Sequence, residues 1–442
     1  MMEETNNILP DKRIVKEIIK KNGIKSVAAA SIREIVKIVN DLEHATGYRY
    51  VRMEMGVPGL PAAEIGVKAE IEALKSGVAS IYPDIEGLPE LKTETSRFIK
   101  LFLDLDISGR TCIPSVGSMM GSIAAFMVAN KSDKNKGVTL FLDPGFPVQK
   151  AQVKMLGQEF VSFDFFNYRG KKLKEKLESI LSEGRISSLI YSNPNNPSWM
   201  CLTEEELSYI GELSNKYDVV VIEDLAYFAM DFRADYSHPG EPPYQPTVGK
   251  YADNYILLIS SSKAFSYAGQ RLGIMAISEA LYDRRYPDLL NYFSTDQFGH
   301  AVVYGVLYGL SAGTAHSAQR GLIAIMKAAN NGDYKFLDIV KEYGEKAKIM
   351  KSLFTDNGFS IAYDSDMDKP IADGFYFTIS YPNMKSGELL EKLLYHGISA
   401  ITLDITGSGM DNGLRICVSH VYREQFPDLE KRLELFRLNN PA

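Results

Sequence analysis

The sequence of 442 residues has few cysteines and histidines and lacks a long apolar run. Its three cysteines, Cys112, Cys201 and Cys417, are far apart and odd in number, which indicates reduced, buried thiols rather than a disulfide framework. The six histidines lack the spacing of metal ligands, so we expect no metal. No apolar stretch could span a bilayer, and the polar, acidic N-terminus is unlike a signal peptide. We therefore expect a cytoplasmic protein.

An excess of positive charge is also lacking. Lysine and arginine number 49 against 56 acidic residues, a net charge of -7, so nothing favours binding to nucleic acid or to an anionic membrane. The apolar content of 45% is that of an ordinary globular protein. The length suits two or three domains, or one large enzyme core with an appendage.

The first two thirds of the chain alternate between strand and helix patterns. Residues 31–42 have the spacing of an amphipathic helix, and the turn-rich residues 55–61 cannot be helical. From about residue 62 to residue 276, short apolar runs alternate with helical stretches, one of which opens with a capping box at Thr203 and Glu206. This alternation predicts an α/β fold, with a three-layer αβα large domain around a mostly parallel sheet.

The pattern changes beyond residue 328. Long charged helices are followed by residues 374–379 and 414–419, which alternate like half-buried strands. This predicts a smaller α+β domain, built from the N- and C-terminal segments. The expected boundaries give an N-terminal segment 1–60, a large domain 61–327 and a small C-terminal domain 328–442.

Lys263 lies in the most informative stretch of the chain. It follows a strand-like run, residues 254–259, and three serines that begin with Ser260, while Arg271 comes eight residues later. Serine hydroxyls and an arginine can bind a phosphate, and a buried lysine loses its proton readily, as imine formation requires. The pattern suits a lysine that forms an imine with an aldehyde cofactor whose phosphate lies close by. The alternative is an ordinary surface lysine after a strand.

Further motifs also follow expected strands, where ligands of an open α/β sheet bind. Gly117, Ser118 and Met119 open a helix whose free backbone N–H groups would hold a phosphate, although such junctions are common. Asn196 lies in a stretch rich in proline and asparagine that also reads as a plain turn.

Asp224 and Tyr227 follow the next expected strand, which ends at Glu223. The aspartate is a candidate partner for a cofactor ring nitrogen, and the tyrosine for a ring oxygen. Taken alone, Asp224 reads equally as the cap of a following helix.

In this order the motifs resemble those of the class I/II aminotransferases, pyridoxal-phosphate enzymes of fold type I related to aspartate aminotransferase. The resemblance extends over roughly residues 31–419 and includes an upstream glycine–proline loop, a tyrosine stretch and an aromatic segment. The matching residues are Gly56, Tyr82, Phe146, Asn196, Asp224, Tyr227, Ser260, Lys263, Arg271 and Arg415.

The resemblance implies an enzyme that moves an amino group between an α-amino acid and a 2-oxo acid, with pyridoxal 5'-phosphate held as a Schiff base on Lys263. It implies that Lys263 carries the proton and that Asp224 keeps the ring nitrogen protonated. Asn196 and Tyr227 would bond the ring oxygen, and Phe146 would stack on the ring.

The remaining matches imply how phosphate and substrate are held. Ser260, Arg271 and the turn formed by Gly117, Ser118 and Met119 would anchor the phosphate. Tyr82 would reach the phosphate of a neighbouring subunit, which implies a homodimer with shared active sites. Arg415, beside Gly56 and Asn196, would grip the substrate carboxylate, although an ordinary salt bridge is the alternative for this arginine.

Some positions depart from the family pattern. Trp199, the only tryptophan, replaces a glycine, and it either narrows the pocket or fills the core. A dicarboxylate substrate would need a second cation, for which Arg284, Arg285 and Lys150 are available. The sequence does not name the substrate.

Two rival functions differ from transamination. The first is a carbon–sulfur β-lyase that uses the same cofactor. The second is a regulator with an aminotransferase-like ligand domain, which would carry a DNA-binding domain ahead of the fold. We expect no such domain, because only roughly thirty residues precede the resemblance and the charge does not suit DNA.

Overall fold

The computed structural model describes residues 9–24 and 26–441. The chain forms two compact units, and each is built from more than one segment. The larger unit comprises Leu60–Asn195 and Met200–Lys341, and the smaller unit comprises Met1–Gly59, Asn196–Trp199 and Glu342–Ala442.

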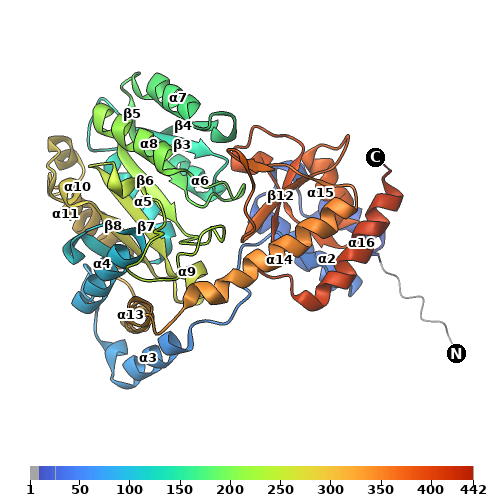
Figure 1. Cartoon of the computed structure of the whole chain (residues 1–442), viewed down its shortest axis with the longest axis horizontal. Coiled ribbons are helices and arrows are strands. Elements are labelled where there is room, and N and C mark those ends of the chain that lie inside the picture. Colours follow the sequence, from blue (N-terminus) through green and yellow to red (C-terminus); the bar gives the residue numbers. More distant parts are fainter. Residues whose placement is uncertain (1–8, 25, 442) are drawn as a thin grey trace. The chain divides into compact units, whose positions relative to one another are not determined.

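A seven-stranded sheet organises the larger unit (Figure 1). The strands are β2 (Cys112–Ser115), β3 (Val138–Asp143), β4 (Glu159–Asp164), β5 (Ile186–Ser192), β6 (Val220–Leu225), β7 (Tyr255–Ser260) and β8 (Gly273–Ile277). Their order is β2-β8-β7-β6-β5-β3-β4, and only β8 runs antiparallel to its neighbours. The expected mostly parallel sheet is confirmed.

Helices cover both faces of this sheet. Helix α5 (Gly117–Ala129) packs across β6, β7 and β8, while α7 (Lys171–Leu181) and α8 (Glu204–Tyr217) pack on each other over the opposite face (Figure 1). The three-layer αβα arrangement is therefore confirmed. The other helices of this unit are α3 (Glu64–Lys75), α4 (Pro89–Leu103), α6 (Pro147–Met155), α9 (Ser261–Ala264), α10 (Glu279–Asp283), α11 (Phe298–His300), the π-helix η8 (Ala301–Leu307), α12 (Tyr308–Ser311) and α13 (His316–Asn330).

The alternation of side chains along β6 decides which layer each residue faces. Val220 and Ile222 join the apolar core that includes the buried face of α5. Because successive strand residues point to opposite faces, Asp224 shares the face of Ile222, and Glu223 points the other way. The strand itself extends to Leu225, so our expectation that it ends at Glu223 is wrong.

The smaller unit mixes helices with short, mostly antiparallel strands. Its main sheet has the order β14-β15-β12-β9, formed by β9 (Ser360–Ile361), β12 (Tyr376–Ser380), β14 (Ile401–Thr402) and β15 (Gly413–Cys417). β10 (Ser365–Asp366) and β11 (Lys369–Pro370) form a separate antiparallel pair. The helices are α1 (Lys12–Lys21), α2 (Ile32–Thr46), α15 (Ser386–Leu394), α16 (Phe426–Asn439) and most of α14 (Phe336–Asp356), which begins in the larger unit.

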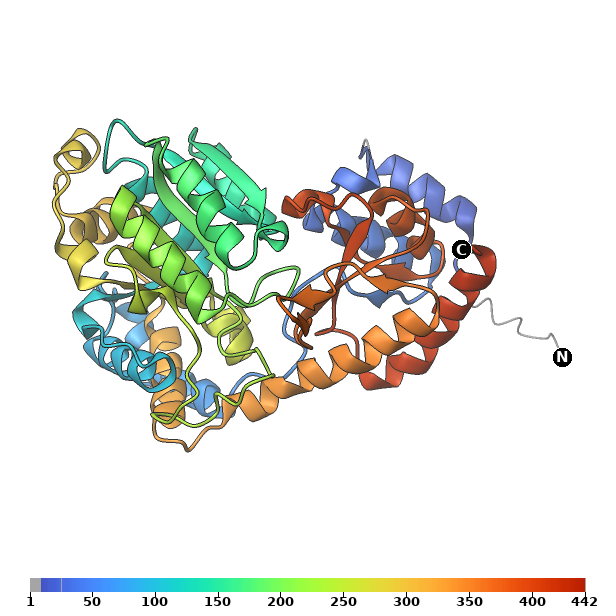
Figure 2. The same cartoon turned by 45° about the horizontal axis from the view of Figure 1, so that its top comes forward.

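Both ends of the chain contribute to this smaller unit. β1 (Val51–Arg52) pairs in parallel with β13 (Ile398–Ser399), so N-terminal and C-terminal elements lie side by side (Figure 2). The expected α+β character is confirmed.

Several absences also hold for the residues that the structure describes. None of the helices there is long and apolar enough to traverse a membrane. No cluster of three or more histidine, cysteine or acidic residues there could hold a metal ion.

Cys112 and Cys417 are buried, as expected, but Cys201 is partly exposed, so our expectation of burial is wrong for that thiol.

Candidate active site

Lys263 and Asp224 come from neighbouring parallel strands. Lys263 lies on α9, directly after β7, and Asp224 lies near the end of β6, which pairs with β7. Burial raises the pKa of Asp224 to about 6, while the hydrogen bond from Gln149, the N–H of Ala226 and the positive charge of Lys263 lower it. The carboxylate is thus buried and lies within the electrostatic influence of the lysine.

Gln149 is a partner of Asp224 that sequence reasoning missed. Its Nε2 donates a hydrogen bond of 2.7 Å to Oδ2 of Asp224, and both side chains are buried. Gln149 lies on α6, three residues after Phe146, which precedes that helix and is partly buried. A neutral amide stabilises the carboxylate without supplying a charge.

The alternative that Asp224 caps a helix is wrong. No helix begins after β6: residues 226–229 form a turn, and the N–H of Ala226 donates to Oδ1 of Asp224 over 3.1 Å. Tyr227 is buried in that turn. Glu223 is held on the opposite face, where it accepts hydrogen bonds from Thr247 and from the N–H of Val248.

A glycine lets an arginine approach the N-terminus of α5. Gly117 has φ +67, and a Cβ atom there would overlap Nη2 of Arg271. A Cβ on Gly273 would lie 2.7 Å from the backbone nitrogen of Ser118. In the described part of the chain Arg271 forms no ion pair, and its Nη1 donates to the carbonyl of Ala268 over 2.9 Å. A guanidinium without a carboxylate partner at a helix N-terminus is suited to hold a phosphate.

Two other expected phosphate contacts have local roles. The hydroxyl of Ser260 accepts a hydrogen bond of 3.2 Å from the N–H of Ser262, so it caps the short helix that carries Lys263. The carbonyl of Met119 accepts a hydrogen bond of 2.8 Å from Gln152.

Arg415 is a buried cation of the smaller unit. It is 1% exposed and forms no ion pair with any described carboxylate, so the salt-bridge alternative finds no support. Its guanidinium donates to Oδ1 of Asn196 over 3.2 Å and to the carbonyl of Glu54 over 2.6 Å, and it lies 4.4 Å from the ring centroid of Tyr376. A buried, unpaired guanidinium is costly unless an anion binds there.

Gly56 and Trp199 lie in the same unit as Arg415. A Cβ atom on Gly56 would overlap the hydroxyl of Tyr376, so only glycine fits this close approach. Trp199 is fully buried, and its ring meets that of Tyr376 edge to face, with centroids 6.1 Å apart. Its indole therefore fills the interior of this unit.

The three cations considered for a second substrate carboxylate are already paired. Lys150 contacts Asp143, Arg284 pairs with Asp218 over 2.6 Å, and Arg285 pairs with Asp296 over 2.6 Å. None of them therefore offers an unpaired charge.

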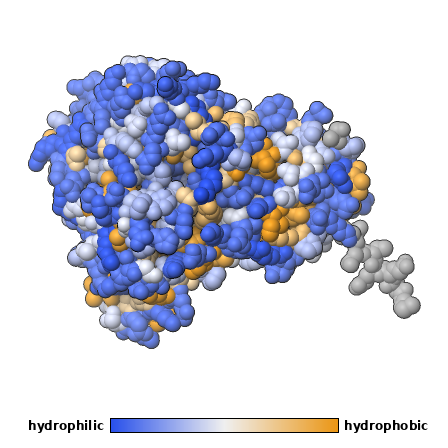
Figure 3. All heavy atoms as spheres, viewed as in Figure 1, coloured by the Kyte–Doolittle hydropathy of each residue, from blue (hydrophilic) through white to orange (hydrophobic). Residues whose placement is uncertain are grey.

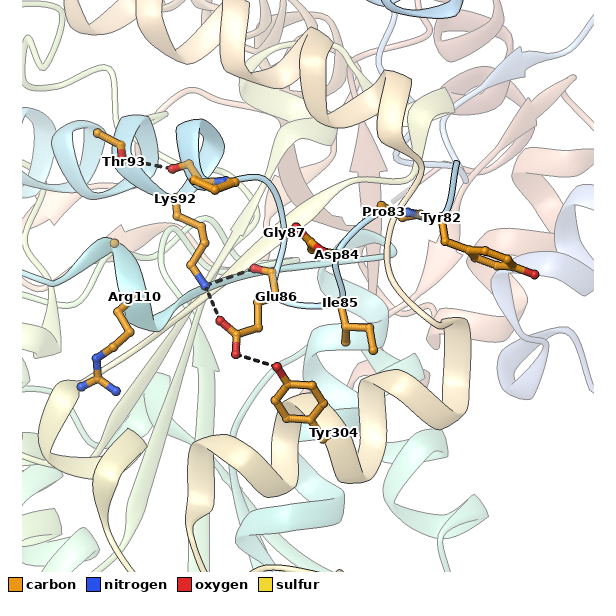
Figure 4. A pocket seen from close by; sticks show the side chains of 12 residues that line it. Tyr82, Pro83, Asp84, Ile85, Glu86, Gly87, Lys92, Thr93, Arg110 and Tyr304 are labelled. Carbon is orange, nitrogen blue, oxygen red and sulfur yellow. Dashed lines mark hydrogen bonds and ion pairs between the residues drawn. The ribbon is translucent and has the colours of Figure 1, made fainter. Parts of the chain in front are cut away.

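Tyr82 differs from the other matching residues because it is 89% exposed. It lines an open depression of about 810 Å³. Lys92 and Glu86 form an ion pair in the same depression, and the hydroxyl of Tyr304 donates a hydrogen bond to Glu86. Figure 4 shows the ring of Tyr82 turned away from that cluster. The phenol is thus available to a neighbouring molecule.

The chain as a whole is similar to a known protein family. The family described as aminotransferase class I and II matches residues 56–433. The chain belongs to this family. It is therefore an aminotransferase, and the resemblance inferred from the motifs is confirmed.

Individual relatives are distant in sequence. A probable aspartate aminotransferase of Methanocaldococcus jannaschii is 22% identical over 93% of this chain and 97% of its own length. An LL-diaminopimelate aminotransferase of Natranaerobius thermophilus is 24% identical over 72% of this chain and 75% of its own length.

Solved structures share the fold. An alanine aminotransferase from Pyrococcus furiosus superposes with a TM-score of 0.71 at 19% identity, covering 95% of this chain and 99% of its own. An aspartate aminotransferase from Thermus thermophilus with maleate gives a TM-score of 0.72 at 16% identity, over 92% and 96% of the two chains.

Proposed function

We propose that this aminotransferase uses pyridoxal 5'-phosphate bound to Lys263. The observation that carries the proposal is the buried carboxylate of Asp224, which lies on the strand beside the one that Lys263 follows and whose pKa the charge of Lys263 lowers. The unpaired Arg271 at the start of α5 supplies what a phosphate needs. The donor set therefore fits this cofactor.

Each residue has a role in the proposal. Bound pyridoxal phosphate would supply an electron sink for proton removal at the α-carbon of the amino acid. Asp224 would hold a proton at the ring nitrogen, and the amine of Lys263 would take the α-proton and return it one carbon away. Tyr227 and Asn196 would bond the ring oxygen, and Phe146 would cover the ring.

The phosphate and the substrate would be held by separate groups. Arg271, Ser260 and the first turn of α5, which contains Gly117, Ser118 and Met119, would bind the phosphate. Arg415 would bind the α-carboxylate through its guanidinium, beside the backbone of Gly56 and the side chain of Asn196.

Trapping the lysine tests the assignment. Borohydride reduction of the purified protein should fix the cofactor to the peptide that contains Lys263, and Lys263→Ala should abolish transamination. Lys346 is the control, because it is a buried lysine whose pKa desolvation lowers to about 8. Label on the Lys346 peptide, or on any peptide other than that of Lys263, would overturn the proposal.

We also propose a homodimer with shared sites. The larger unit exposes large apolar and aromatic side chains on α3, directly after the 3-10 turn η2 (Val78–Ser80) and on η8 and α12. These side chains are Ile65, Val67, Ile71, Leu74, Ile81, Tyr304, Tyr308 and Leu310. Figure 3 shows hydrophobic residues at the lower end of this unit, where α3 lies in Figure 1. A surface of this kind is suited to bury itself against a second copy of the chain. Tyr82 would then serve the phosphate of the partner subunit.

The substrate belongs to the α-amino acids, and the relatives are named for different ones, among them aspartate and LL-diaminopimelate. A screen of amino donors with 2-oxoglutarate as acceptor would identify the preferred donor. Turnover that requires the 2-oxo acid would also separate transamination from a β-lyase reaction.

A further inference from the structure

Trp199 occupies a backbone conformation that suits glycine. Its φ is +66, in the left-handed region that a bulky side chain rarely adopts. It is also fully buried and is the only tryptophan of the chain. The packing of the indole must compensate for this unfavourable backbone.

The indole has a specific location in the smaller unit. A Cβ atom on Gly374 would overlap the indole ring, and Gly374 is not among the residues with positive φ. Glycine at 374 therefore provides room rather than backbone freedom. The indole meets the ring of Tyr376 at an interplanar angle of 70°.

Tyr376 connects the indole to Arg415. The two lie on adjacent strands, where Thr378 of β12 is opposite Arg415 of β15, so Tyr376 and Arg415 share one face of the sheet. The guanidinium lies 4.4 Å from the tyrosine ring centroid, and the tyrosine hydroxyl abuts Gly56. Both groups proposed to bind the carboxylate thus contact one buried phenol.

We propose that Trp199 is a positioning residue for the substrate carboxylate, acting through Tyr376 on Arg415. The tyrosine fixes the plane of the guanidinium by a cation–π contact. Asn196 and the carbonyl of Glu54 take two of its donors, while the buried Nε has no hydrogen-bond partner among the described residues. The inference rests on the carboxylate role proposed for Arg415.

Replacing the indole tests this position. Trp199→Leu keeps apolar volume but removes the ring, and we expect KM to rise about tenfold, the equivalent of about 1.4 kcal/mol. Because every substrate carries an α-carboxylate, the rise should be equal for small and large amino donors and for the 2-oxo acid. Trp199→Phe keeps an aromatic ring, so its KM should lie close to that of the wild-type enzyme. A change confined to bulky donors would place the indole in the side-chain pocket, and a lower Tm with unchanged KM would show that its packing serves stability alone; either result overturns the inference.

A second background separates this inference from the function on which it rests. Arg415→Lys removes the planar guanidinium that Tyr376 is proposed to hold in place. Adding Trp199→Leu to this variant should therefore raise KM no further. An indole effect that persists in this background overturns the inference alone. An unchanged KM in Arg415→Lys itself would instead show that the carboxylate role of Arg415 is wrong.

The single tryptophan also offers a direct readout. Titration of the holoenzyme with propionate, an unreactive carboxylate, should change the tryptophan emission over the concentrations that inhibit turnover. In Tyr376→Leu, propionate should still inhibit, although more weakly, and the emission should no longer respond. An emission that stays constant during inhibition of the wild-type enzyme, or that still responds in Tyr376→Leu, would contradict coupling through Tyr376.

Discussion

At the scale of single residues, Arg415 and Arg432 are two buried arginines of the smaller unit that differ in whether a carboxylate pairs with them. Arg432 pairs with Asp428 over 2.7 Å and donates to backbone carbonyls, whereas Arg415 has no carboxylate among the described residues. We expect Arg415→Ala to lower kcat/KM for the amino donor by about two to three orders of magnitude, because a bidentate carboxylate contact is lost. Steady-state kinetics and the cofactor absorbance measure this effect.

Arg432→Ala is the control for that substitution. It should lower Tm, because it breaks a paired and buried group, while the catalytic constants of the folded protein stay the same. Loss of bound cofactor in Arg415→Ala would show that Arg415 has a structural role.

Asp224 and Glu223 are adjacent buried carboxyls on opposite faces of β6. Burial raises the pKa of Asp224 to about 6 and that of Glu223 to about 7. Both carboxyls bind a proton more tightly in the folded protein than in the unfolded chain. Their protonation therefore adds to the free energy of unfolding: this contribution is complete below about pH 4 and is lost as the pH rises to 6 for Asp224 and to 7 for Glu223. Neutral amides at these positions should therefore stabilise the cofactor-free protein at pH 7.5, by on the order of 2 kcal/mol each.

Activity should separate the two substitutions. Asp224→Asn should lose most turnover, since it removes the charge at the ring nitrogen, while Glu223→Gln should retain it. Denaturation between pH 4 and pH 8 and turnover at pH 7.5 are the two measurements. If Asp224→Asn keeps near-normal activity, its carboxylate has no electronic role.

The residues proposed to carry the chemistry could be selected from the sequence because the fold places them where strands end. Lys263 and Asp224 follow or end neighbouring strands, so their proximity follows from strand order. Gln149 was not readable, because its partner is 75 residues away and no local pattern marks such a contact. The contact of Tyr376 with Arg415 was missed for the same reason.

At the scale of elements, two helices begin with the same capping box in different surroundings. On α8, Thr203 and Glu206 form the box, and buried Glu206 also pairs with Arg169 over 2.8 Å. On α2, Ser31 and Glu34 form an exposed box. Although burial opposes it, the pairing with Arg169 and the backbone hydrogen bonds hold the pKa of Glu206 below its usual value.

The two boxes should respond very differently to truncation. We expect Glu206→Ala to destabilise the protein by about 3–5 kcal/mol, because it removes both the helix cap and the buried carboxylate that pairs with Arg169. Glu34→Ala should cost only about 0.5–1 kcal/mol, the value of a solvated cap. Urea denaturation of both variants measures the difference, and equal losses would show that the pair of Glu206 with Arg169 adds nothing to the cap.

Sequence patterns located these elements well because capping boxes and apolar alternation are local signals. The capping box at Thr203 is confirmed. The end of β6 was misplaced, because the two acidic residues at 223 and 224 resemble the end of a strand. Ladder contacts with β5 and β7 continue the strand past them.

At the scale of the whole molecule, the proposed dimer makes a prediction about shared sites. If Tyr82 serves the phosphate of the partner subunit, a site needs Tyr82 from one chain and Lys263 from the other. Tyr82→Phe homodimers then lack the phenol in both sites, and Lys263→Ala homodimers lack the lysine in both. In a hybrid of the two variants, one site carries both substitutions and the other carries neither.

Mixing the two variants should therefore restore activity above that of either parent. After subunit exchange, confirmed by native mass spectrometry of differently tagged chains, we expect half of the hybrid sites to be intact. The control mixes Asp224→Asn with Lys263→Ala, two residues assigned to the same chain, so that each hybrid site carries one substitution and activity stays low. Ile71→Asp in the exposed surface should weaken assembly, because it places a charge where apolar groups meet. Exchange without recovery would assign Tyr82 to its own subunit, and a chain that stays monomeric at assay concentration would contradict the shared site altogether.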